Sequence, residues 1–207
     1  PAGGNVYAND AKVRMLQIIL TAGNQENVNI PSITFKVGGI GDDSLLITKV
    51  RLFNDLNNNG SIESTDPQIG ITKTFLSDNG TVTYDYLTEV VTLGTSESWI
   101  LTFDFVGIEQ AVEGSTFYVT LQSAESLTAK GALTEEDITP TGSFPITSNT
   151  MTLYLAREEK KKSIGCACSF DNAPADYTDS ASYFIPVMLL FGTVILLKFK
   201  IRKSVKN

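Results

Sequence analysis

Residues 98–105 read Ser-Trp-Ile-Leu-Thr-Phe-Asp-Phe, and the alternation in this stretch decides the fold class. Its large apolar side chains Trp99, Leu101, Phe103 and Phe105 recur at every second position. Successive side chains of a β-strand point to opposite faces of the sheet. The period therefore predicts a strand with these four side chains in a core and with Ser98, Thr102 and Asp104 facing water.

The same two-residue period recurs in four further runs of the chain. These runs lie at residues 12–21, 31–37, 81–86 and 116–121. They predict the following additional core side chains: Leu16, Ile18, Leu20, Ile33, Phe35, Val37, Val82, Tyr84, Tyr86, Phe117, Val119 and Leu121. Since all these runs belong to residues 1–156, this part of the chain is predicted to form one domain with its own core.

Short breakers rich in glycine and asparagine separate the runs. Asn79-Gly80 is the clearest of them, and it predicts a tight hairpin between residues 71–75 and the run that follows. Roughly eight or nine short strands and no long helix can be read from residues 1–156. The pattern predicts an all-β fold, specifically an antiparallel immunoglobulin-like β-sandwich with Greek-key connections.

The chain divides by charge into an acidic body and a basic end. Residues 1–156 carry seven Lys or Arg and eighteen Asp or Glu, a net charge of −11. Residues 157–207 carry nine and five, a net charge of +4. Nucleic-acid binding requires a basic face, so the acidic body argues against a nucleic-acid partner. It suits an extracellular protein that binds cations.

Histidine and cysteine, which often act as catalytic or metal-binding residues, are scarce. The sequence contains no histidine, which excludes histidine-based triads and histidine-ligated zinc or haem. Its two cysteines, Cys166 and Cys168, both follow the body, so the body has no disulfide framework. No signal peptide is visible at Pro1, and we expect either that one has been removed or that the chain belongs to a longer protein.

Residues 55–66 carry the most specific motif, Asp-Leu-Asn-Asn-Asn-Gly-Ser-Ile-Glu-Ser-Thr-Asp. Oxygen-bearing side chains stand at positions 1, 3 and 5, glycine at position 6 and a carboxylate at position 12, which is the spacing of EF-hand-type calcium loops. The predicted Ca²⁺ ligands are Asp55, Asn57, Asn59, the carbonyl of Ser61, Glu63 (directly or through water) and Asp66. Gly60 allows the sharp turn, and Ile62 is predicted to tether the loop to the core.

Two features distinguish this loop from a calcium sensor. Its closing residue is Asp66 rather than glutamate, which resembles dockerin-type loops, and both flanks read as strands rather than helices. With so few carboxylates we expect weak binding, a Kd of ~10⁻⁴–10⁻³ M as in extracellular modules, and a structural role for the ion. The alternative is a metal-free turn rich in asparagine and glycine.

The end of the chain predicts a membrane anchor. A polar spacer at 157–182 precedes an apolar stretch at 183–201, which is predicted to be a transmembrane helix, and residues 202–207 form a basic tail. Basic residues flanking a span stay in the cytoplasm, so the N-terminal body is expected on the cell surface, with membrane lipid as a partner.

A cysteine motif, a terminal apolar segment and a basic end together resemble bacterial C-terminal sorting signals of the MYXO-CTERM and rhombosortase type. The resemblance implies that a membrane protease cuts the tail and that Gly165 with Cys166 or Cys168 carries the sorting or lipid-attachment step. Two plain spacer thiols, or an intermolecular disulfide, are the alternatives.

The body resembles a β-sandwich module of large bacterial surface proteins, over residues 3–153. The segments that carry the resemblance are Gly4-Asn-Val, residues 16–21, Gly41-Asp-Asp, residues 50–60, Asp78-Asn-Gly-Thr and Leu101-Thr-Phe-Asp-Phe. The resemblance implies a surface module without catalytic residues. The leading hypothesis is therefore a non-catalytic structural or adhesive surface protein that associates with copies of itself or with other surface proteins and glycans.

Two other function classes stay open. A carbohydrate-binding module would need a row of exposed aromatic side chains. A glycoside hydrolase would need paired carboxylates, for which Asp42 with Asp43, or the run Glu135, Glu136 and Asp137, are the candidates. Charged runs in polar loops are more often simply solvated, and the second group could equally bind a cation.

Overall fold

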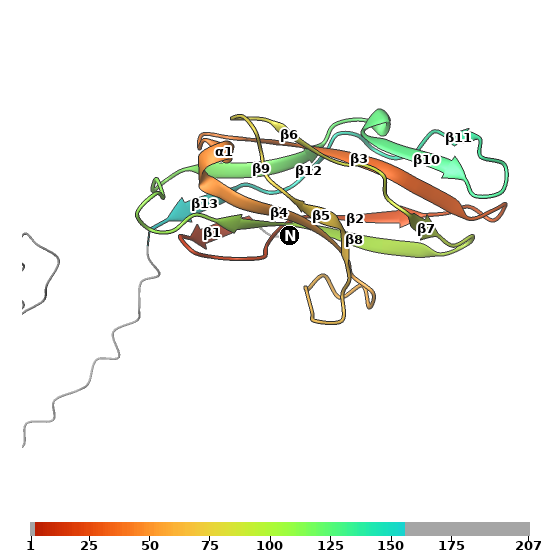
Figure 1. Ribbon diagram of the computed structural model, residues 1–207, viewed down its shortest axis with the longest axis horizontal. Helices are drawn as coiled ribbons and strands as arrows, with labels where there is room; N and C mark the ends of the chain where they lie inside the picture. Colours follow the sequence, from red (N-terminus) through yellow and green to blue (C-terminus); the bar gives the residue numbers. More distant parts are fainter. Residues whose placement is uncertain (1–2, 156–207) are drawn as a thin grey trace, which may run out of the picture. The chain divides into compact units, whose positions relative to one another are not determined.

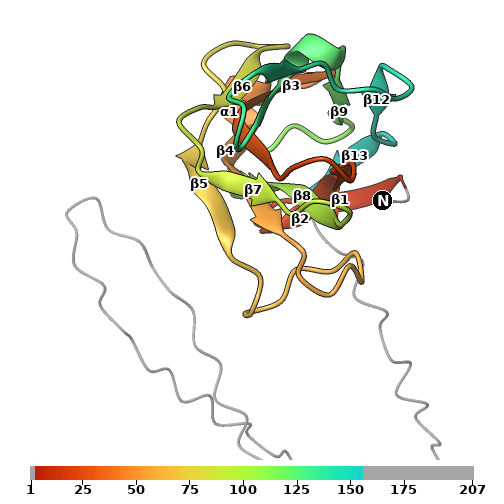
Figure 2. The ribbon, with the colours of Figure 1, turned by 90° about the vertical axis from the view of Figure 1, so that its right-hand side faces the viewer.

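The computed structural model describes residues 3–155, which form two facing β-sheets (Figures 1 and 2). This confirms the all-β prediction. The elements are β1 (Gly4–Tyr7), β2 (Val13–Thr21), β3 (Val28–Gly39), α1 (Asp43–Leu46), β4 (Ile47–Asn54), β5 (Gln68–Lys73), β6 (Thr81–Tyr84), β7 (Glu89–Val91), β8 (Ser96–Phe105), β9 (Thr116–Leu121), η1 (Ala124–Ser126), β10 (Leu127–Gly131), β11 (Asp137–Ile138), β12 (Ile146–Thr147) and β13 (Met151–Tyr154).

The larger sheet is organised around β3, which has strands on both sides. One edge of β3 pairs with β6 and β7, and the other pairs with β9 and β10. β12 and β13 pair with β9, β11 pairs with β10, and β1 joins at β13. The smaller sheet has the order β2-β8-β4-β5. Its central strands are thus β8 and β4.

Two details differ from the sequence prediction. β1 runs parallel to β13, so the strands are not antiparallel throughout. The predicted hairpin at Asn79-Gly80 is wrong, because β5 belongs to the smaller sheet and β6 to the larger one. Asn79 adopts a left-handed φ of 50°, as the turn signal predicts. Its N–H donates to a carboxylate oxygen of Asp43, the first residue of α1, at 2.8 Å. The turn is therefore a crossover that is anchored on α1.

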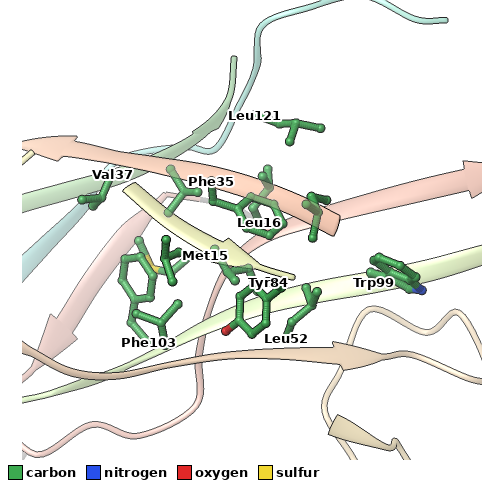
Figure 3. Close-up of a cluster of buried hydrophobic side chains, with 14 of the residues drawn as sticks. Met15, Leu16, Phe35, Val37, Leu52, Tyr84, Trp99, Phe103 and Leu121 are labelled. Atoms are coloured by element: carbon green, nitrogen blue, oxygen red, sulfur yellow. The ribbon is translucent and has the colours of Figure 1, made fainter. Parts of the chain in front are cut away.

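The core lies between the sheets and contains most of the side chains that the alternation predicts (Figure 3). Trp99, Phe103 and Phe117 are fully buried, and aromatic rings pack edge to face where Phe103 meets Phe75. Tyr86 is the clear exception, with 94% of its surface exposed. The chain turns there with a φ of 56°, so the period of β6 does not continue to this residue.

The outer face of β8 is also covered, which the alternation did not predict. Ser98, Thr102 and Asp104 are all buried although they point away from the core. Neighbouring strands supply the cover: Arg51 of β4 forms an ion pair with Asp104, and the Thr102 hydroxyl donates to the Arg51 carbonyl at 3.3 Å. A central strand flanked by long side chains is thus shielded on both faces.

Candidate calcium site

The predicted calcium loop connects β4 to β5 and extends from the smaller sheet (Figures 1 and 2). Its two ends are held close together. The Asn54 N–H donates to the Pro67 carbonyl at 3.0 Å, and the Asp55 N–H donates to the Ser98 carbonyl of β8 at 2.7 Å. The loop therefore starts and finishes on a rigid base formed by strands of the sheet.

Side-chain oxygens at positions 1, 3 and 5 turn back onto the loop backbone. Asp55 accepts from the Gly60 N–H at 2.8 Å and from the Asn59 N–H at 3.2 Å. Asn57 Oδ1 accepts from the Asn59 N–H at 3.1 Å, and Asn59 Oδ1 accepts from the Ser61 N–H at 2.7 Å. Gly60 has a φ of +71°, which glycine adopts without a Cβ penalty. These contacts curl the chain around its own backbone N–H groups.

The carboxylates at positions 9 and 12 close the loop. Asp66 accepts from the Leu56 N–H at 3.2 Å and from the Glu63 N–H at 2.7 Å. Glu63 accepts from the side-chain amides of Asn57 at 3.0 Å and Asn59 at 2.7 Å. The structure thus brings these predicted ligands into one hydrogen-bonded network. Ser61 takes part through its amide, and coordination by its carbonyl stays a prediction.

The residues present fit a calcium ion. Asp55 and Asp66 are buried, and within residues 3–155 neither carboxylate forms an ion pair. Backbone N–H groups donate to both carboxylates but do not neutralise their charge, which a bound cation would compensate. The donor set consists of oxygens, as Ca²⁺ prefers. No group of three acidic side chains within residues 3–155 would hold a metal alone, so amide and carbonyl oxygens would have to complete the shell.

The contact that ties the loop to the sheet was missed by sequence reasoning. Ile62 is half-buried and lies outside the hydrophobic cluster, so it is not the tether predicted from position 8. Gln17 of β2 and Ser98 of β8 instead reach the Asp55 carboxylate, each at 3.4 Å. Neither residue has a local sequence signal, because only strand pairing brings β2 and β8 next to the loop.

The acidic pair considered for hydrolysis, Asp42 and Asp43, accepts hydrogen bonds from backbone N–H groups. Asp42 caps α1 and accepts from the Ser44 N–H at 3.0 Å and the Ser44 hydroxyl at 2.6 Å. Asp43 is fully buried, and burial raises the pKa of its carboxyl to about 6 while the Asn79 N–H opposes that rise. Of the other acidic run, Asp137 is exposed and pairs with Lys130 at 3.4 Å.

The predicted sorting and anchoring segments lie outside the described residues. This applies to Gly165, Cys166 and Cys168, to the spacer at 157–182, to the predicted transmembrane helix at 183–201 and to the basic tail. Within residues 3–155, no helix has the length and apolar character required to cross a bilayer.

Comparison of the chain with protein-family models, curated proteins and solved structures gave no match. The resemblances to surface modules and to sorting signals therefore stay predictions from the sequence.

Proposed function

We propose that this chain is a non-catalytic, immunoglobulin-like module of the cell surface, braced by calcium and membrane-anchored or sorted through its C-terminus. The observation that carries the proposal is the closed loop between β4 and β5, in which Asp55 and Asp66 are buried without a cationic partner among residues 3–155. Extracellular calcium is millimolar, so a site with a Kd of ~10⁻⁴–10⁻³ M would be occupied in about half of the molecules or more.

Calcium would act here as a structural ion. β4 and β5 pair antiparallel, and the loop is the connection that fixes their relative position. Asp55, Glu63 and Asp66 bring three negative charges into one loop, and a divalent cation among them would relieve their mutual repulsion. An ion that binds only the folded state raises the stability of that state.

Strand edges give the module a means of self-association. Within residues 3–155, β2 pairs on one side only, with β8. It is nine residues long, and an unpaired edge of this length can accept a strand from another molecule. This supports assembly of copies into a surface layer or filament.

The surface location can be tested on cells that make the protein. We expect protease added to intact cells to remove the body, and intact mass spectrometry of the extracted protein to show either all 207 residues or a chain ending within 166–182. The second mass would show that a sorting protease has acted. Full protection from protease in intact cells would contradict the surface location.

A carbohydrate-binding module is the second candidate. An open groove of about 590 Å³ lies between β2 and the strands β10 to β12, and Phe144, Thr21 and Glu136 are among the residues that line it. Of the aromatic side chains named from the sequence, Trp99 and Tyr84 are buried in the core with the phenylalanines. Tyr86 is exposed, and one exposed ring is not a row. Binding on a glycan array that Phe144→Ala abolishes would favour this candidate.

A further inference from the structure

The two carboxylate oxygens of Asp55 have different surroundings. Oδ2 accepts from the Gly60 N–H at 2.8 Å, from Gln17 Nε2 at 3.4 Å and from the Ser98 hydroxyl at 3.4 Å. Oδ1 accepts from the Asn59 N–H at 3.2 Å. Oδ2 therefore accepts from the sheet as well as from the loop, whereas the hydrogen bond to Oδ1 comes from the loop.

Gln17 and Ser98 are themselves fixed. Gln17 Nε2 donates to Ser98 Oγ at 2.8 Å, across the antiparallel pair of β2 and β8. An amide nitrogen carries two protons and a hydroxyl donates one, so these groups can make all three contacts at once. Ser98 is buried, and its carbonyl also accepts the Asp55 N–H at 2.7 Å.

Gln17 also lies against the turn of the loop. A Cβ built on Gly60 would stand 3.2 Å from Gln17 Oε1, which is tight for a carbon–oxygen contact. The first and sixth positions of the loop thus rest on the same pair of strands. The position of Asp55 is set by the sheet as well as by the loop.

We propose that Gln17 and Ser98 are positioning residues for the calcium site, which hold Asp55 Oδ2 against the sheet so that Oδ1 is presented to the cation. This inference rests on the proposed calcium function. A ligand that is already oriented loses less conformational freedom when the ion binds, and hydrogen-bond partners of metal ligands typically contribute 10–100-fold in affinity.

The test measures calcium affinity of the full chain in detergent micelles by titration calorimetry. Ser98→Ala and Gln17→Ala should each weaken the Kd by about 10-fold, the lower end of that range, because the contacts to Asp55 are long. Ser96→Ala and Thr21→Ala are matched controls. These two residues form a hydroxyl pair at 2.7 Å on the same strands without touching the loop, and both variants should bind calcium like the wild type.

The Kd and the melting temperature together distinguish a positioning role from a role in folding. A purely structural role would lower the melting temperature but leave the Kd of the folded protein unchanged, and that result would overturn the inference. Gln17 is only half-buried, so Gln17→Ala provides the test even where Ser98→Ala lowers the yield of folded protein. Absence of binding to the wild type up to about 10 mM calcium would instead refute the proposed calcium function itself.

Discussion

Replacing Asp66 by alanine should remove the response of the protein to calcium. The carboxylate is buried and accepts two backbone N–H groups, from Leu56 and Glu63. Each lost hydrogen bond costs ~1 kcal/mol, so Asp66→Ala should lower the free energy of unfolding by about 2 kcal/mol without calcium. A domain of this size loses ~2–4 °C in melting temperature per kcal/mol, which gives a decrease of about 4–8 °C.

The stabilisation of the folded protein by calcium is measured separately in the same experiment. With a Kd of ~10⁻⁴–10⁻³ M, about 2 mM calcium should stabilise the wild type by ~0.6–1.8 kcal/mol. That corresponds to a rise in melting temperature of about 1–7 °C for the wild type and none for Asp66→Ala. Circular dichroism melts of the full chain, with calcium or with chelator, measure both values.

Glu109→Ala is the control, because it removes an exposed carboxylate from a different loop. It should keep the calcium-dependent rise of the wild type. The reasoning would be refuted if Asp66→Ala also kept that rise, or if chelator and calcium gave the same melting temperature for the wild type.

Three further predictions follow from individual residues. Asp43 has a folded-state pKa of about 6 against an ordinary 3.8, so its contribution to stability is complete below pH 3.8 and is lost as the pH rises through 6. At ~1.4 kcal/mol per pH unit, Asp43→Asn should gain about 2 kcal/mol relative to the wild type between pH 4 and 7.5 in denaturant titrations, and a constant difference over this range would contradict the prediction. Gly60→Ala should lower the free energy of unfolding by about 1 kcal/mol and weaken calcium binding, because φ is +71° and the added Cβ would meet Gln17. An unchanged melting temperature and an unchanged Kd in calorimetry would contradict this. Phe103→Ala should cost ~3–5 kcal/mol in the same titrations, since the ring is fully buried, and a loss below about 1 kcal/mol would argue against this core.

The sequence predicts the strands well where one face of the sheet is apolar and the other polar. Trp99, Phe103 and Phe117 are buried as their period requires. The period does not reveal what covers the opposite face. Thr102 and Asp104 are buried, and Arg51 of the neighbouring strand contacts Asp104 through its guanidinium and Thr102 through its carbonyl. Strand pairing of this kind cannot be read from a local pattern.

The connections are where local signals fail. Asn79-Gly80 does form a turn with a left-handed residue, but the signal fixes only backbone conformation and not the partner of the next strand. Asp43, distant in sequence, supplies the contact that turns it into a crossover. A local turn motif therefore predicts a change of direction more reliably than it predicts a hairpin.

The predicted calcium loop shows the same division between local and distant information. Residues 55–66 carry the spacing of the site, and the structure joins Asp55, Asn57, Asn59, Glu63 and Asp66 in one network. The support comes from Gln17 and Ser98, which lie on different strands and 81 positions apart in the sequence. Only the sheet order brings that support under the loop.

Calcium binding to the wild-type chain tests the central claim most directly. Titration calorimetry in detergent micelles should show one Ca²⁺ per chain with a Kd of ~10⁻⁴–10⁻³ M. Backbone amides of residues 55–66 should exchange more slowly with deuterium in the same samples once calcium is added. Absence of heat and unchanged exchange up to about 10 mM calcium would contradict the account.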